Sequence, residues 1–157
     1  MSDNPVAIVT GGSRGVGAAT ARMLSENGWN VVITCSSSLK DADQVAKNCT
    51  NENAEVVALQ ADVSKDLECI ATINKAIEKW GRIDALINNA GTTKFAWDHS
   101  DLDSLTAEDF QYIYGVNVVG PFQMVKAAKE HLLKSENPCV VNISSIAGIK
   151  GIGSSVA

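Results

Sequence analysis

The chain has 157 residues, 45% of them hydrophobic, and its formal net charge at pH 7 is -5. This length fits one domain with a substantial core, and the composition argues against intrinsic disorder. The negative charge disfavours nucleic acid and anionic membranes as bulk partners, and no apolar run approaches the roughly 20 residues of a membrane span.

The N-terminal residues show no basic segment followed by an apolar one, so no secretory signal is expected. The four cysteines are scattered along the chain without a CxxC pair or a histidine at metal-ligand spacing. Their spacing favours reduced thiols in a cytoplasmic protein over a disulfide or zinc framework.

Apolar runs alternate with segments of helical periodicity along the chain. The runs predict five strands, at residues 6–9, 31–33, 55–60, 83–87 and 139–143. Near-continuous apolar strands that alternate with helices are typical of a parallel sheet covered on both faces. We therefore expect an α/β fold with a Rossmann-type, doubly wound parallel sheet in three αβα layers, forming a single domain over residues 1–157.

The clearest predicted helix follows the third strand. Ser64 is its expected N-cap and Gly81 its stop. Its core-facing stripe is expected to comprise Leu67, Ile70, Ile73, Ile77 and Trp80. Two further helices are predicted over about 106–116 and, after Pro121, on to 134.

A glycine-rich turn, Thr10 to Gly17, lies between the first strand and the first helix. Glycines let a phosphate approach the backbone, and a helix N-terminus offers free N–H donors and a favourable dipole. We expect Gly11 to make the turn, Gly15 to admit the pyrophosphate and Gly17 to let helix and strand pack closely. The turn lacks the Lys-Ser/Thr of a P-loop, and a purely structural turn is the alternative.

Polar residues follow the later strands: Asp62-Val63, Asn88 to Gly91, and Ser144-Ser145. In open α/β sheets, ligands bind outside the carboxyl ends of the strands, so these segments are expected to converge on one crevice. Taken singly, each is also compatible with a cap or a turn.

Together with Asn117, these motifs in this order resemble the classical short-chain dehydrogenase/reductase family, and locally its 3-oxoacyl-carrier-protein reductases. The resemblance implies an enzyme that binds NAD or NADP and transfers a hydride between the nicotinamide and a carbonyl or alcohol carbon. It also implies a set of cofactor contacts: Gly11, Ser13, Arg14, Gly15, Val16 and Gly17 around the phosphates, Asp62 and Val63 at the adenine, and Asn89, Ala90 and Gly91 along the ribose.

Two catalytic positions follow from the same resemblance. Ser145 matches the serine that hydrogen-bonds the substrate oxygen, and Asn117 matches the asparagine that supports a proton relay. The alternatives are that Ser145 caps a turn and that Asn117 fixes a helix irregularity between Gly115 and Gly120. No metal is implied.

The end of the second strand bears on the choice of cofactor. An acid there would bond the ribose hydroxyls and repel a 2′-phosphate, but the position holds Cys35, followed by Ser36, Ser37 and Ser38. Their hydroxyl groups can hold a phosphate, and the Arg14 guanidinium can reach it. We therefore expect NADP rather than NAD, with Arg14 as a merely solvated turn residue as the alternative.

The family's Tyr-x-x-x-Lys pair does not occur in the chain. The two tyrosines, Tyr112 and Tyr114, are followed four residues later by Val116 and Val118, and they are interpreted as core or interface residues. The family's tyrosine would fall just after Ala157. We therefore expect the front portion of a longer enzyme, inactive by itself; the alternative is a non-catalytic nucleotide-binding or regulatory module. The resemblance further implies a small carbonyl or alcohol substrate and a homo-oligomer, dimer or tetramer, formed through residues 106–134.

Overall fold

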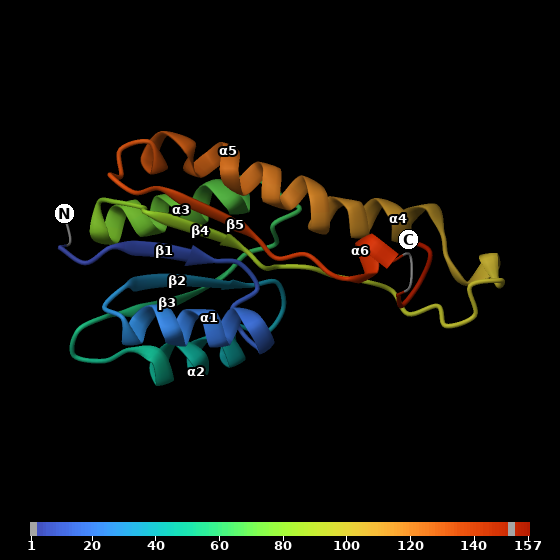
Figure 1. Ribbon diagram of the computed structural model, residues 1–157, viewed down its shortest axis with the longest axis horizontal. Coiled ribbons are helices and arrows are strands. Elements are labelled where there is room, and N and C mark those ends of the chain that lie inside the picture. The colour runs from blue at the N-terminus through green and yellow to red at the C-terminus, as the bar shows by residue number, and fades with distance from the viewer. Residues whose placement is uncertain (1–2, 151–152) are drawn as a thin grey trace.

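The computed structural model describes residues 3–150 and 153–157. Five parallel strands form one sheet in the order β3-β2-β1-β4-β5 (Figure 1). Their bounds are Val6–Val9 for β1, Asn30–Cys35 for β2, Val56–Gln60 for β3, Ala85–Asn88 for β4 and Cys139–Asn142 for β5. The strand order reverses between β1 and β4, which is where such sheets bind ligands. The predicted fold class is confirmed.

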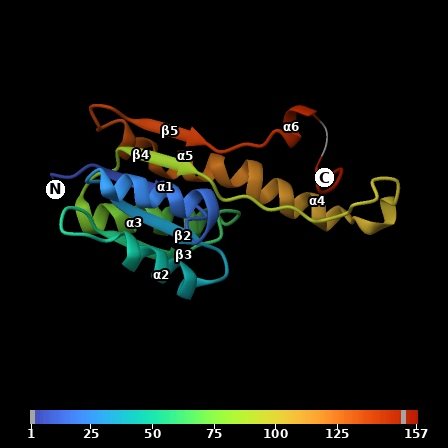
Figure 2. The ribbon, with the colours of Figure 1, turned by 60° about the horizontal axis from the view of Figure 1, so that its bottom comes forward.

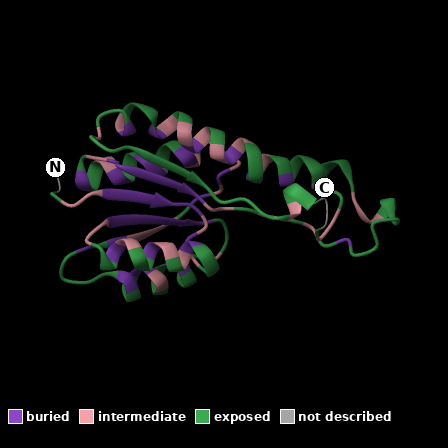
Figure 3. Ribbon diagram, viewed as in Figure 1, coloured by how far each residue is buried: buried purple, intermediate pink, exposed green. Residues whose placement is uncertain are grey.

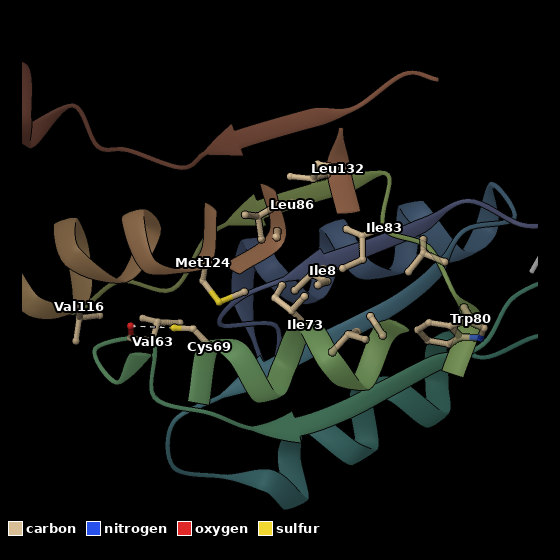
Figure 4. Packing of buried hydrophobic residues seen from close by; sticks show 14 residues of the cluster. Ile8, Val63, Cys69, Ile73, Trp80, Ile83, Leu86, Val116, Met124 and Leu132 are labelled. Carbon is tan, nitrogen blue, oxygen red and sulfur yellow. Dashed lines mark hydrogen bonds between the residues drawn. The ribbon is translucent and has the colours of Figure 1, made fainter. Parts of the chain in front are cut away.

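Helices cover both faces of the sheet (Figures 1 and 2). α1 (Gly15–Glu26) and α2 (Leu39–Cys49) lie on one face, and α3 (Asp66–Trp80) and α5 (Gly120–Leu132) lie on the other. Each face has its own core cluster: the α3–α5 side packs around Ile8, Leu86 and Met124 (Figure 4). Burial is concentrated in β1, β2 and β4, as the purple strands of Figure 3 show.

The buried face of α1 consists of small side chains, whereas that of α3 combines small and large ones. Gly17, Ala21 and Ser25 are the buried residues of α1, whereas Met23 is 65% exposed. On α3 the buried face is Cys69, Thr72, Ile73, Ala76 and Trp80. The predicted stripe is therefore right at Ile73 and Trp80. It is wrong at Leu67, which is 80% exposed, and at Ile70, because Cys69 and Thr72 occupy the buried face in the first half of the helix.

The first turn of α3 also differs from the expectation. Its N-cap is Lys65, and the hydroxyl of Ser64 instead donates to Asp62 Oδ1 at 2.7 Å. The end is as predicted: Gly81 adopts φ 75° and its N–H donates to Ile77 O at 2.9 Å. A left-handed residue at this place favours glycine.

The segment before β5 is one long helical rod. α4 (Ala107–Tyr114) begins with a capping box between Thr106 and Asp109, continues through a π-helix at Gly115–Val119 and passes directly into α5. The predicted break at Pro121 is absent: Pro121 is the second residue of α5 and follows the π-helix within the continuous rod. The rod carries α4 beyond the carboxyl edge of the sheet (Figure 1).

Two short elements complete the described chain: a 3-10 helix at Leu102–Ser104 and α6 at Ala147–Lys150. β5 is the last strand of the sheet and pairs only with β4 among the described residues. All four of its residues are exposed, in contrast to the fully buried β1 and β4. The sheet therefore has an open edge at β5.

Candidate cofactor site

A cleft of about 670 Å³ lies at the carboxyl ends of β1, β2 and β4. This volume is within the range of small-molecule sites. Four segments that are far apart in sequence line it: the glycine-rich turn, the stretch from Thr34 to Ser38, Ala61 to Val63, and Asn89 to Thr92. The structure thus brings together the strand-end motifs that the sequence placed in one crevice, although Ser144 and Ser145 do not line it.

Glycine is required at the different positions of the turn for different structural reasons. Gly11 and Gly15 have positive φ, at 67° and 55°, which strains other residues. A Cβ on Gly17 would collide with Gly11 O and Asn89 Nδ2, whereas a Cβ on Gly15 would meet nothing within 4 Å. The open side of Gly15 leaves space for a ligand beside the first N–H groups of α1. Gly12, which sequence analysis did not single out, lies against Ile33, where a Cβ would come within 2.5 Å of the Ile33 Cβ.

Thr10 and Asn89 fasten the turn to the end of β4. Thr10 Oγ1 accepts hydrogen bonds from the N–H groups of Asn89 and Ala90, both at 3.0 Å. In return, Asn89 Nδ2 donates to Thr10 O at 2.9 Å and to Gly11 O at 3.0 Å. These four bonds fix the floor of the cleft without using the outward-facing donors of the turn.

Asp62 lines the cleft just after the end of β3. Its Oδ1 accepts from the N–H of Ser64 at 3.0 Å and from the Ser64 hydroxyl, and its Oδ2 lies 3.8 Å from Lys65 Nζ. The Asp62 N–H donates to Glu68 Oε2 at 2.6 Å. This hydrogen bond, with that from Lys65, lowers the pKa of Glu68 from its ordinary value. Asp62 is therefore held in one position by its neighbours.

Arg14 and the serines after β2 are free to bind a ligand. Among residues 3–150 and 153–157, the Arg14 side chain has no hydrogen bond or ion pair, and neither do the hydroxyls of Ser13, Ser36, Ser37 and Ser38. All of these residues line the cleft, and Arg14 is exposed. Cys35 is buried beside them, and burial, followed by the fields of Asp43 and Asp41, raises the pKa of its thiol.

Asn117 lies in the π-helix, next to the cleft rather than in its lining. Its Oδ1 accepts from the Thr92 N–H at 2.8 Å and its Nδ2 donates to Thr92 O at 2.9 Å. The helix irregularity between Gly115 and Gly120 is therefore present, and Asn117 joins it to the loop after β4. π-helical turns occur frequently at functional sites, so both interpretations of Asn117 stay open.

Ser145 is exposed between β5 and α6. Its Oγ accepts from the Ala147 N–H at 3.2 Å and its carbonyl accepts from the Gly148 N–H, as in a turn cap. Such a bond leaves the hydroxyl proton available as a donor. Within the described residues, no tyrosine is hydrogen-bonded to Ser145.

Sequence reasoning missed the side chains that two helices contribute to the cleft. Tyr112, interpreted as core or interface, is 54% exposed and lines the cleft together with Val116, one helical turn later. Asp41 and Gln44 enter from the first turns of α2. The i, i+4 spacing of Tyr112 and Val116 is a sequence signal that could have paired them. For Asp41 and Gln44, the sequence signal is that α2 begins directly after Ser38.

Neither a metal site nor a membrane-spanning helix is found among the described residues. The four cysteines are unpaired, with Cys35, Cys49 and Cys69 buried and Cys139 exposed. Within residues 3–150 and 153–157, no group of three or more metal-ligating side chains is found. Likewise, none of the helices in this described part is long and apolar enough to cross a membrane.

Comparison with known proteins agrees with this architecture. A model of the family described as short chain dehydrogenase matches residues 5–157. A protein assigned as ketoacyl reductase 2 of the granaticin polyketide synthase of Streptomyces violaceoruber is 40% identical over 152 residues, which are 97% of this chain and 59% of the relative. The chain belongs to the short-chain dehydrogenase family.

Two solved structures extend the likeness to three dimensions. A protein of Burkholderia xenovorans assigned to the short-chain dehydrogenase/reductases matches with a TM-score of 0.93 and 38% identity, over 99% of this chain and 65% of that one. A short-chain dehydrogenase of Burkholderia cenocepacia, solved in complex with NADP, matches with a TM-score of 0.86 and 31% identity, over 96% and 59%. The chain thus spans about three fifths of the length of the relatives it matches.

Proposed function

We propose that the protein is an NADP-dependent oxidoreductase that transfers a hydride between the nicotinamide and a carbonyl or alcohol substrate. The observation that carries this proposal is the unpartnered Arg14 guanidinium, which lies with free serine hydroxyls in a cleft of the size of a ligand site. A guanidinium binds phosphate oxygens in a bidentate manner. The relative solved with NADP supports the same assignment.

The residues of the cleft fit such a cofactor. Gly15 leaves open space beside the N-terminus of α1, where unpaired N–H groups and the helix dipole favour a pyrophosphate. Asp62, fixed by Ser64 and Glu68, would accept from the adenine amino group. Ala90 and Gly91 would run along the ribose. The cofactor, when bound, supplies the hydride.

Ser145 would donate its hydroxyl proton to the substrate oxygen while continuing to accept from the Ala147 N–H. Asn117 would support a proton relay, as its match to the family's asparagine implies. The Tyr and Lys that complete the family's chemistry are proposed to follow Ala157 in the complete protein. Reading the next codons of the gene tests that part directly: a stop codon would favour a non-catalytic nucleotide-binding module instead.

The substrate class is proposed from the Streptomyces relative, which is assigned as a ketoacyl reductase. A 3-oxoacyl thioester is therefore the first substrate to assay. We also propose a cytoplasmic homo-oligomer. Its contact surface would be the exposed apolar side of the long rod, including Tyr114, Val118 and Phe122.

A fluorescence titration with NADPH and NADH tests the cofactor assignment. We expect saturable NADPH binding that is tighter than NADH binding. The variant Arg14→Leu should weaken NADPH binding about tenfold, the effect of one charged hydrogen-bonded contact, and NADH binding much less. Equal or tighter NADH binding by the unaltered protein would overturn the NADP assignment.

A further inference from the structure

The cleft contains two carboxylates with different surroundings. Asp62 is engaged by Ser64 and Lys65, as described above. Asp41 also lines the cleft, but its side chain has no hydrogen bond or ion pair within residues 3–150 and 153–157. Of the described residues that line the cleft, Arg14 is the single cationic one, and it has no hydrogen bond or ion pair with any of the others. An unneutralised anion and an unneutralised cation thus share the cleft.

Asp41 is placed beside the end of β2. It is the third residue of α2, and the stretch from Cys35 to Ser38 that leads into this helix lines the same cleft. In such folds, residues at the end of β2 contact the 2′-substituent of the adenosine ribose, which is a hydroxyl in NAD and a phosphate in NADP. Asp41 therefore lies in the part of the cleft where NADP and NAD differ.

We propose that Asp41 is a specificity-determining residue that repels the 2′-phosphate. The balance between this repulsion and the attraction of Arg14 sets the preference between NADP and NAD. A carboxylate near a phosphate of charge about -1.5 to -2 weakens its binding, whereas it leaves the ribose hydroxyl of NAD unaffected or accepts from it. Asp41, on the next helix, thereby repels a 2′-phosphate as an acid at position 35 would. This inference rests on the proposed function, because it presupposes that the cleft holds a nicotinamide dinucleotide.

A purely structural role for Asp41 makes a different prediction. An acid in the first turn of a helix stabilises that helix through its dipole, and Asp41 occupies such a position in α2. Loss of that contribution would lower the stability of the protein and would weaken both cofactors alike. The ratio of the two dissociation constants therefore separates the roles.

The test compares Asp41→Asn with Asp43→Asn in fluorescence titrations of the complete protein with NADPH and NADH. Asp43 is the matched control, because it lies on the same helix and carries the same charge but lines a different groove with Ala46 and Val56. We expect Asp41→Asn to tighten NADPH binding about fivefold. NADH binding should change by less than about twofold. Asp43→Asn should move the ratio less than Asp41→Asn does, because Asp43 lies outside the cleft, although its field also reaches Cys35.

The outcomes are distinguishable. If the unaltered protein binds NADPH but Asp41→Asn leaves the NADPH/NADH ratio unmoved, the inference about Asp41 is overturned while the proposed function stands. The inference is equally overturned if Asp43→Asn moves the ratio as far. If the unaltered protein binds neither dinucleotide, the proposed function fails and the inference fails with it.

Discussion

Asn117 hydrogen-bonds both polar backbone atoms of Thr92, accepting from its N–H at 2.8 Å and donating to its carbonyl at 2.9 Å. One side chain in the π-helix therefore holds the last residue of the Asn89 to Thr92 segment of the cleft, where the loop begins. The loop continues past the stacked rings of Phe95 and Trp97, whose centroids lie 5.0 Å apart. Asn117 thus has a structural duty that is independent of any proton relay.

Replacing Asn117 by Ala should loosen this loop. Both hydrogen bonds are lost, and since they are exposed we expect a cost of about 1 kcal/mol in the free energy of unfolding. Amide hydrogen exchange should quicken over residues 92–97 and stay unchanged over β4. The control Asn117→Asp keeps the acceptor for the Thr92 N–H and should perturb the loop less. Unchanged hydrogen exchange at Thr92 in Asn117→Ala would contradict the role given to the two Asn117–Thr92 hydrogen bonds.

Replacing Gly17 by Ala should damage the cofactor cleft. The added Cβ would collide with Gly11 O and Asn89 Nδ2, so the bonds between Asn89 and the turn cannot persist without movement. We expect NADPH affinity to fall at least about tenfold, measured by fluorescence titration. Gly148→Ala is the control, because nothing lies within 4 Å of its added Cβ. Wild-type affinity in Gly17→Ala would show that the turn is not part of the binding site.

Asp84 should make stability depend on pH. It is only 3% exposed and accepts from Arg82, from Ser135 Oγ and from the Val6 N–H. Burial alone would raise the pKa of Asp84, but these hydrogen bonds outweigh it and hold the pKa below its ordinary value. For a lowered pKa, the stabilisation is present above the unfolded value of about 4 and is lost as the pH falls through the folded value.

The variant Asp84→Asn should therefore be less stable by about 2 to 4 kcal/mol at pH 7, because it removes a buried, paired charge. The difference from the unaltered protein should shrink as the pH is lowered from 5 toward 2, measured by urea denaturation. Glu78→Gln, which removes one partner of the exposed Lys75–Glu78 pair, is the control and should change stability by less than about 0.5 kcal/mol. A constant difference across this range would contradict the assignment of the pH dependence to Asp84.

The four thiols should react at very different rates. Burial, followed by Asp66 and other neighbouring acids, raises the pKa of Cys69 to about 11, and burial also raises the pKa values of Cys35 and Cys49. Only the thiolate is nucleophilic, so these three should be slow at pH 8, and Cys139 is the exposed one. An Ellman titration of the native protein should count one fast thiol, which Cys139→Ser removes. A second fast thiol would show that one buried site opens readily.

The sequence predicted the fold and the composition of the cleft because both depend on chain order. Parallel strands end at the same edge, so Gly11, Asp62 and Asn89 had to meet once the five strands were recognised. Helix faces were harder: hydrophobic periodicity favoured Leu67, whereas close helix–sheet approach selects small residues such as Ala76. Asp41 and Tyr112 could not be placed because their positions depend on how far α2 and the long rod extend past the sheet.

The residues that flank β4 have two unrelated structural roles. Asp84 precedes the strand and ties together three segments of the fold, while Asn89 follows it and braces the glycine-rich turn. Five residues of extended chain separate these positions by roughly 16 Å. Effects of substitutions at such distances usually add. Substitutions that change the acid stability contributed by Asp84 should therefore leave the bracing of the glycine-rich turn by Asn89 unchanged.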